Sequence, residues 1–141
     1  MGETNKVYRL YLTIYYEDTD AGGVVYYANY LKYFERARTE FLMDKGIDIV
    51  QYHNEGYFFV VIHVEISYKR PATLGDEIEI TTELAELPSA TIAMNHKVLK
   101  QGEILVESSV RLACINREGR PQRIPEEIKN IFPDQGESTS H

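Results

Sequence analysis

The spacing of apolar and polar residues changes several times along the chain. Residues 7–17 alternate with period two, which predicts a strand with Tyr16 on the same side as the aliphatic residues. Residues 18–23 predict a tight loop, because aspartates satisfy local backbone donors and paired glycines permit positive φ. Apolar residues then recur at three- and four-residue steps, which predicts a helix over residues 28–45 that Gly46 terminates.

The remaining chain predicts one short helix and four more strands. The helix covers residues 48–55, with Asp48 as its N-cap and Gly56 after its end. Apolar and polar residues alternate regularly from residue 77 to residue 84, which predicts that one face of the sheet is exposed to solvent. The long helix must then cover the other face. Short connections favour antiparallel neighbours, so we expect an α+β fold in which a meander curls around the long helix. The four strands are expected at residues 57–68, 77–87, 90–100 and 104–115.

The length of 141 residues allows one compact domain. We assign residues 7–132 to this domain, residues 1–6 to an N-terminal extension and residues 133–141 to a frayed polar tail. The net charge of −7 opposes binding to nucleic acid or to an anionic membrane. Residues 1–6 lack the pattern of a signal peptide and no apolar run approaches the ~20 residues that span a bilayer, so we expect a cytoplasmic protein.

Few side chains suggest metal or redox chemistry. Cys114 is the single cysteine, which excludes an intramolecular disulfide and a cysteine-based zinc site, and its apolar surroundings predict a core position. His53, His63 and His96 lack the spacing of a metal cluster. The common nucleotide-binding and serine-hydrolase motifs are also absent from the sequence. We therefore expect neither a metal nor a cofactor.

Candidate chemistry concentrates in residues 17–30, where carboxylates and glycines lead directly into the long helix. A helix N-terminus offers unpaired N–H groups and a positive dipole end, which stabilise negative charge on a carbonyl oxygen. Asp18 or Asp20, held nearby, can act on that carbonyl as a nucleophile or as a base for water. The pattern alone leaves a second interpretation open, in which both aspartates only cap the turn and the helix end.

Residues 16–31 read YEDTDAGGVVYYANYL and residues 34–40 read FERARTE. This long run closely resembles the 4-hydroxybenzoyl-CoA thioesterase family, and within it the acyl-CoA thioesterases associated with the Tol-Pal system. The resemblance continues through residues 57–124 and so covers nearly the whole chain. It implies the hotdog fold, in which a five-stranded antiparallel sheet wraps around one long helix.

The resemblance also implies an activity, the hydrolysis of an acyl-CoA to a free acid and CoA. The catalytic carboxylate of the family falls on Asp20, and its oxyanion donor falls on the backbone N–H of Tyr27. Close relatives often carry histidine at the second position, so the tyrosine here keeps only the role of its amide. Whether Asp20 attacks the thioester or activates water stays open, as does the choice between CoA and acyl carrier protein as the acyl donor.

The phosphates of CoA require cations, and the acidic chain offers a few candidates. Lys69 and Arg70 precede Pro71, and Arg117 belongs to a basic C-terminal group, so we assign these three to substrate binding. A solvated surface role is the alternative for each of them. The other candidates are Lys97, Lys100, Arg120 and Arg123.

Glu35 is a second candidate carboxylate, because some hotdog thioesterases place their catalytic carboxylate on the long helix. The spacing favours another role, since Glu35 can pair with Arg38 and Arg36 can pair with Glu40 along a helix surface. We therefore predict an ion-pair network at this position and leave Glu35 out of the candidate site.

The expected fold also bears on the oligomeric state of the protein and on functions other than thioester hydrolysis. Unprotected sheet edges favour oligomers, and the resemblance implies a homodimer or homotetramer. A non-catalytic acyl-carrier or cell-envelope adaptor would keep the fold without needing Asp20. A dehydratase would need a histidine near the long helix, and none occurs between Asp20 and Glu40.

Eight of the 11 tyrosines lie between Tyr8 and Tyr33, and we expect some of them to line an acyl or pantetheine channel.

Overall fold

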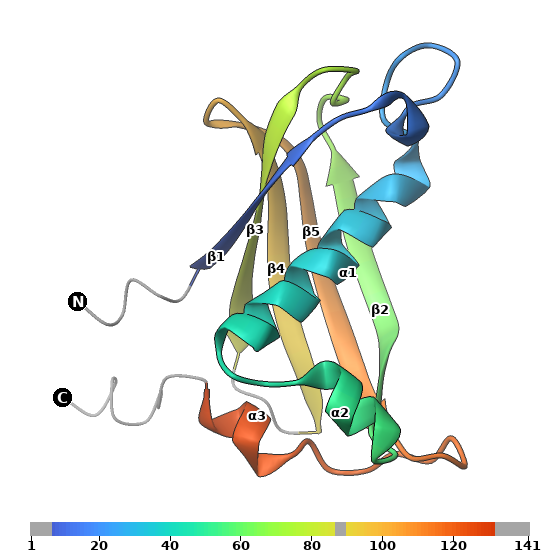
Figure 1. Cartoon of the computed structure of the whole chain (residues 1–141), viewed down its shortest axis with the longest axis vertical. Coiled ribbons are helices and arrows are strands. Elements are labelled where there is room, and N and C mark those ends of the chain that lie inside the picture. The colour runs from blue at the N-terminus through green and yellow to red at the C-terminus, as the bar shows by residue number, and fades with distance from the viewer. Residues whose placement is uncertain (1–6, 87–89, 132–141) are drawn as a thin grey trace, which may run out of the picture.

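The chain folds as a five-stranded antiparallel sheet that curves around one long helix (Figure 1), in a computed structural model that describes residues 7–86 and 90–131. The helix is α1 (Tyr27–Asp44). This architecture confirms the predicted α+β class and the hotdog fold. In sheet order the strands are β1 (Val7–Thr13), β3 (Glu77–Glu86), β4 (Thr91–Lys100), β5 (Glu103–Ile115) and β2 (Phe58–Tyr68).

The predicted N-terminal extension and polar tail lie outside the described residues, as does residue 87 at the end of the third predicted strand. Within the described ranges, none of the helices is both long enough and apolar enough to cross a membrane.

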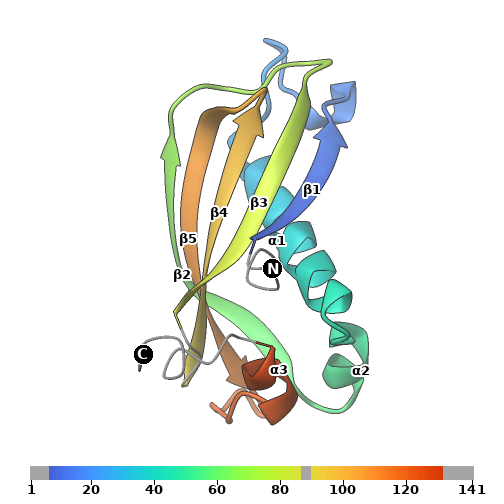
Figure 2. The same cartoon turned by 90° about the vertical axis from the view of Figure 1, so that its left-hand side faces the viewer.

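Helix α1 lies against one face of the sheet, as Figure 2 shows from the side. Its inner face forms two core clusters, because apolar side chains recur along it at helical spacing. In the first core cluster Tyr30 and Phe34 pack with Ile78 and Ile80 of β3. In the second core cluster Phe41 and Leu42 pack with residues of β4, β5 and the two short helices, among them Met94 and Ile128. The predicted role of the helix as the cover of the sheet is therefore confirmed.

The strand order corrects the predicted meander. Only β3, β4 and β5 follow one another as neighbours, whereas β2 pairs with β5 at one edge and β1 pairs with β3 at the other. The segment between β2 and β3 is therefore a crossover and not a hairpin. The short connection before residue 77 was expected to join neighbouring strands, but the Gly75 N–H in it donates to the carbonyl of Ile14, directly after β1. Local turn residues predict a reversal of the chain and do not specify which strand it meets.

The first strand ends earlier than its alternation predicts. β1 stops at Thr13, and residues 16–18 form a short 3-10 turn in which the Tyr15 N–H donates to the Asp18 carboxylate at 2.8 Å. Alternation is lost at this turn, so Tyr16 is 80% exposed instead of lying beside the buried Ile14. A side-chain acceptor close in sequence has overridden the strand pattern.

The two short helices differ in how well their sequences predict them. Helix α2 (Ile49–Asn54) begins where expected, and its Asp48 N-cap accepts a hydrogen bond from the Gln51 N–H. Helix α3 (Glu126–Asn130) was not predicted, although Pro125 followed by two glutamates is a typical helix start. It buries Ile128 completely in the second core cluster.

The predicted ion-pair network on α1 does not form within the described part of the chain. Arg38 turns toward the sheet and its guanidinium lies 3.3 Å from the ring of His96, while Glu40 accepts a hydrogen bond from the Tyr8 hydroxyl. The two side chains point to different sides of the helix and contact β4 and β1 respectively, so partners on strands replace partners one turn away. The buried Cys114 belongs to the second core cluster, as predicted.

Candidate active site

The loop before α1 is held to the start of the helix by its backbone. The Asp18 carbonyl oxygen accepts from the Tyr26 N–H at 3.1 Å and from the Asn29 side-chain amide at 2.8 Å. Asp18 thus uses its carboxylate for the 3-10 turn and its carbonyl for the helix start. The Asp18 side chain therefore caps the turn, whereas its contacts with the helix start come from its backbone carbonyl.

A second set of bonds fixes the same loop to the crossover between β2 and β3. The Val25 N–H donates to the Ala72 carbonyl at 2.8 Å, and the Leu74 N–H donates to the Gly23 carbonyl at 3.0 Å. Gly23 has a φ of +82°, a conformation that other residues adopt at a cost, so this turn requires glycine. The loop is therefore held both by the helix start that follows it and by the crossover, which is far away in sequence.

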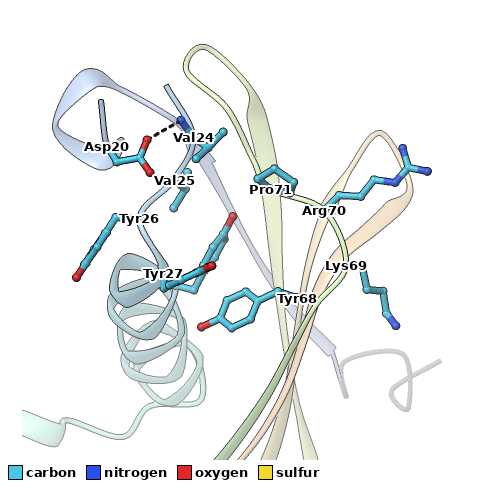
Figure 3. Close-up of a pocket in the computed structure, with 10 residues that line it drawn as sticks. Asp20, Val24, Val25, Tyr26, Tyr27, Tyr68, Lys69, Arg70 and Pro71 are labelled. Carbon is cyan, nitrogen blue, oxygen red and sulfur yellow. Dashed lines mark hydrogen bonds between the residues drawn. The ribbon is translucent and has the colours of Figure 1, made fainter. Parts of the chain in front are cut away.

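Asp20 has one engaged and one free carboxylate oxygen. Its Oδ1 accepts from the Gly22 N–H at 2.8 Å and from the Val24 N–H at 3.4 Å (Figure 3). Its Oδ2 accepts no hydrogen bond from the residues that the structure describes. The loop amides thus orient the carboxylate and leave one oxygen available at the exposed end of the loop.

The first turn of α1 supplies the complementary donor. The N-cap, Tyr26, provides no side-chain cap, and the N–H of Tyr27 has no acceptor among the described residues. An unpaired N–H at the positive end of an 18-residue helix can donate to an oxygen on which negative charge develops. Asp20 and Tyr27 line the same cavity, which brings together the two residues that the sequence analysis put first.

That cavity has a volume of about 410 Å³ and a wall of tyrosines. The ring of Tyr68, at the end of β2, lies 5.1 Å from that of Tyr27 and 5.7 Å from that of Tyr30, between centroids. Burial raises the pKa of both Tyr30 and Tyr68, which keeps these rings neutral near pH 7. Part of the N-terminal tyrosine cluster therefore lines the cavity.

Lys69 and Arg70 also line the cavity, from the start of the crossover. Their ammonium and guanidinium groups lie 3.7 Å from Glu107 and 3.0 Å from Glu103, respectively, in ion pairs that are largely exposed. Arg117 is elsewhere: its guanidinium donates to the carbonyl of Asn54 at the end of α2, beyond the C-terminal end of α1. The structure thus brings four of the five candidate residues together within one chain.

The sequence analysis missed Tyr68 as part of the site. It belongs to the predicted second strand, where an aromatic residue needs no special explanation. Its position directly before Lys69 and Arg70 was the available signal, because consecutive residues at a strand end share one edge of the sheet.

Comparison with known proteins places these features in a family. Residues 15–132 match the model of the thioesterase-like superfamily. The chain is 38% identical over 123 residues to the acyl-CoA thioesterase YbgC of Haemophilus influenzae, with 84% of this chain and 89% of that protein covered. It is 34% identical over 128 residues to the acyl-CoA thioester hydrolase YbgC of Escherichia coli O6:H1, with 89% of this chain and 96% of that protein covered.

Solved structures agree with the sequence comparisons. The crystal structure of a probable thioesterase from Bartonella henselae superimposes with a TM-score of 0.80 at 39% identity, and the match covers 84% of this chain and 99% of that one. The match of the family model, the relatives and the fold together establish that this chain is an enzyme that belongs to the thioesterase-like superfamily.

Proposed function

We propose that the chain is an acyl-CoA thioesterase that hydrolyses its substrate to a free acid and CoA. The observation that carries the proposal is that one cavity is lined by both Asp20 and Tyr27, whose Oδ2 and backbone N–H have no hydrogen-bond partner among the described residues. The names of the H. influenzae and E. coli relatives support the same substrate class.

In the proposed mechanism the thioester carbonyl oxygen accepts a hydrogen bond from the Tyr27 N–H. Negative charge that develops on this oxygen is stabilised by the amide and by the helix dipole. Attack on the carbonyl carbon forms a C–O bond and breaks the C–S bond, and the CoA thiolate then takes up a proton. Because hydrogen bonds from the loop hold Oδ1 of Asp20, Oδ2 is the oxygen that takes part in this attack.

Two routes fit this geometry. In the first, Oδ2 attacks directly, and water then hydrolyses the mixed anhydride and regenerates Asp20. In the second, Oδ2 takes a proton from a water molecule that attacks the carbonyl. Hydrolysis in ¹⁸O-labelled water under single-turnover conditions separates the second route from an anhydride that water opens at the Asp20 carbonyl. That anhydride puts ¹⁸O in the Asp20 carboxylate and none in the acid, whereas the second route puts one ¹⁸O in the acid and none in Asp20.

For the CoA moiety we propose a path along the tyrosine wall to Lys69 and Arg70. Exposed ion pairs contribute little to stability, so phosphates can replace Glu107 and Glu103 at small cost. Replacing Lys69 and Arg70 by glutamate should raise KM for acyl-CoA more than it lowers kcat.

We further propose that two copies associate through the free edge of β2. This edge strand exposes Val61, Ile62 and Val64 at 47, 53 and 39%, and an apolar unpaired edge favours pairing with another strand. Light scattering at micromolar concentration should give the mass of a dimer or tetramer, and Ile62→Lys should shift it toward one chain. A monomer mass for the unchanged protein would contradict this proposal.

The activity is tested with a panel of acyl-CoAs from acetyl to long-chain, together with aromatic acyl-CoAs and acyl carrier protein thioesters. A thiol reagent detects released CoA with low background, because the single cysteine, Cys114, is buried. Hydrolysis of no member of the panel would overturn the proposal and favour a binding or adaptor role.

A further inference from the structure

A polar cluster lies inside a largely apolar groove between α1 and the β2–β5 side of the sheet. The groove has a volume of about 390 Å³. Four polar residues interrupt its apolar wall, namely Glu35, Arg38, Thr39 and Ser108. Of these, the half-buried Arg38 and the buried Ser108 lie next to the buried His96. A guanidinium or a hydroxyl in apolar surroundings costs free energy unless it forms a hydrogen bond with a polar partner. The apolar wall includes Leu31, Phe34, Leu42, Phe59, Val110 and Leu112.

Contacts with the sheet orient Arg38. Its Nη1 lies 3.3 Å from Nε2 of His96, whose ring is 1% exposed and stacks on Phe34 with 4.8 Å between centroids. Nδ1 of His96 lies 3.0 Å from the Thr82 hydroxyl. Burial and the charge of Arg38 lower the pKa of His96 to about 3, so the imidazole is neutral and Nε2 accepts from the guanidinium.

This arrangement leaves the Arg38 charge without a close anion. In residues 7–86 and 90–131 no carboxylate forms an ion pair with Arg38. The exposed Glu35 lines the same groove and acts on Arg38 only through its charge. Burial lowers the pKa of Arg38, and Glu35 opposes this shift, but the guanidinium stays protonated at neutral pH. The groove therefore holds an oriented cation with unused N–H donors.

Ser108 provides an independent sign of a missing partner. Its side chain is 7% exposed, and its hydroxyl has no hydrogen-bond partner among the described residues. In the β4–β5 register Ser108 lies directly opposite His96, so its hydroxyl is close to the Arg38 contact. A buried hydroxyl without a partner costs free energy, which an oxygen acceptor in the groove would recover.

The groove and the candidate active site are both lined by residues of α1 and β2. Leu31 lies one helical turn beyond Tyr27, and Val64 precedes Tyr68 on β2 by four residues. From Tyr27 to Arg38 the helix rises about 16 Å. An acyl chain whose thioester lies at Tyr27 can therefore extend through the groove toward Arg38.

We propose that this groove selects acyl groups that end in a carboxylate, the monothioesters of dicarboxylic acids. The terminal carboxylate would accept hydrogen bonds from the Arg38 guanidinium and the Ser108 hydroxyl, and would neutralise the half-buried cation. A methyl terminus would instead cover both donors without pairing them. The inference rests on the proposed function, because it takes the thioester to bind at Asp20 and Tyr27.

The test compares acyl-CoAs that differ only in their terminal group: suberoyl-CoA with octanoyl-CoA, and sebacoyl-CoA with decanoyl-CoA. Binding is measured by titration calorimetry on the Asp20→Asn protein, which removes turnover from the measurement. We expect at least one dicarboxylic member to bind about 10- to 100-fold more tightly than its straight-chain match. Equal or weaker binding of both dicarboxylic members would overturn the inference.

Variants assign the preference to its residues. Arg38→Met should abolish the preference, whereas Arg36→Met, an exposed arginine on the same helix, should keep it. Ser108→Ala removes a hydroxyl that has no partner in the free protein, so it should fold normally and reduce the preference about 3- to 10-fold. An unchanged preference in Ser108→Ala and in folded Arg38→Met would overturn the assignment.

The outcomes separate this inference from the proposed function. Turnover of straight-chain acyl-CoAs without any carboxylate preference would overturn the inference and leave the thioesterase proposal intact. A carboxylate preference in binding without turnover of any acyl-CoA by the unchanged protein would support the groove and overturn the thioesterase proposal.

Discussion

The two ends of α1 face different surroundings. At its N-terminal end the backbone N–H of Tyr27 has no acceptor in the described part of the chain, and the loop around Asp20 is exposed, with order supplied by backbone hydrogen bonds. At its C-terminal end Phe41 and Leu42 are buried among the strands and the two short helices. The difference indicates a division of labour, in which one end leaves donors and acceptors available and the other supplies burial. Changes at the first end should alter turnover, and changes at the second should alter stability.

The largest expected effect comes from Asp20→Asn. We expect kcat to fall about 100- to 10,000-fold, because the amide can act neither as nucleophile nor as base. Its side-chain oxygen can still accept from the Gly22 N–H, so the thermal midpoint should stay near that of the unchanged protein. Steady-state kinetics and a thermal melt measure the two effects.

The matched control for Asp20→Asn is Asp44→Asn, at the other end of α1. This exposed residue lies outside the cavity, so its replacement should leave turnover unchanged. Full activity of Asp20→Asn, or an equal loss in Asp44→Asn, would break the proposed division between the ends.

Phe41→Ala tests the other end. Phe41 is 1% exposed in the second core cluster, and its truncation should cost about 3–5 kcal/mol in the free energy of unfolding. Denaturant titration measures this loss, and kcat per folded molecule should stay close to its original value. The exposed neighbour Met43, replaced by alanine, should change neither quantity, so a large effect there would argue against burial as the cause.

The middle of α1 should make stability depend on pH through His96. Its folded pKa of about 3 lies below the unfolded value of 6.5, so the unfolded chain binds a proton between these values while the folded chain does not. Stability should therefore fall as the pH decreases from about 6.5 toward 3, by up to about 1.4 kcal/mol per pH unit.

Denaturant titrations between about pH 7 and pH 4 measure this dependence. His96→Gln cannot take up the proton, so its stability should vary less over the same range, whatever its stability at pH 7. An identical slope in both proteins would assign the acid sensitivity to other groups.

Asn29→Ala should give the smallest effect of the set. The variant loses the 2.8 Å bond from the side-chain amide to the Asp18 carbonyl, which keeps its bond from the Tyr26 N–H. We expect kcat to fall up to about 10-fold, consistent with about 1 kcal/mol for one hydrogen bond, while KM stays nearly constant. Lys32→Ala, on the exposed face of the next turn, serves as the control. A rise in KM without loss of kcat would indicate substrate contact instead of loop positioning.

The sequence predicted the secondary-structure elements better than the contacts between them. Period-two and helical patterns predicted α1 and all five strands, because the pattern of burial is written directly in the residue types. The predicted pairing of Glu35 with Arg38 did not form, since helical spacing reveals neighbours on the helix but not the buried His96 across the sheet. Tyr68 was missed for the same reason: its contact with Tyr27 joins β2 to α1.

By itself the sequence determined the local elements, the loop with Asp20 and the helix start at Tyr27, because these depend on residues close together in the chain. The tertiary structure alone decided the strand order, the crossover that fixes the loop, and the separation of Arg117 from Lys69 and Arg70. It also put an oriented Arg38 beside an unpaired Ser108. Such juxtapositions follow from which strands pair and where the helix packs, and these choices minimise the free energy of the whole chain and not of any one segment.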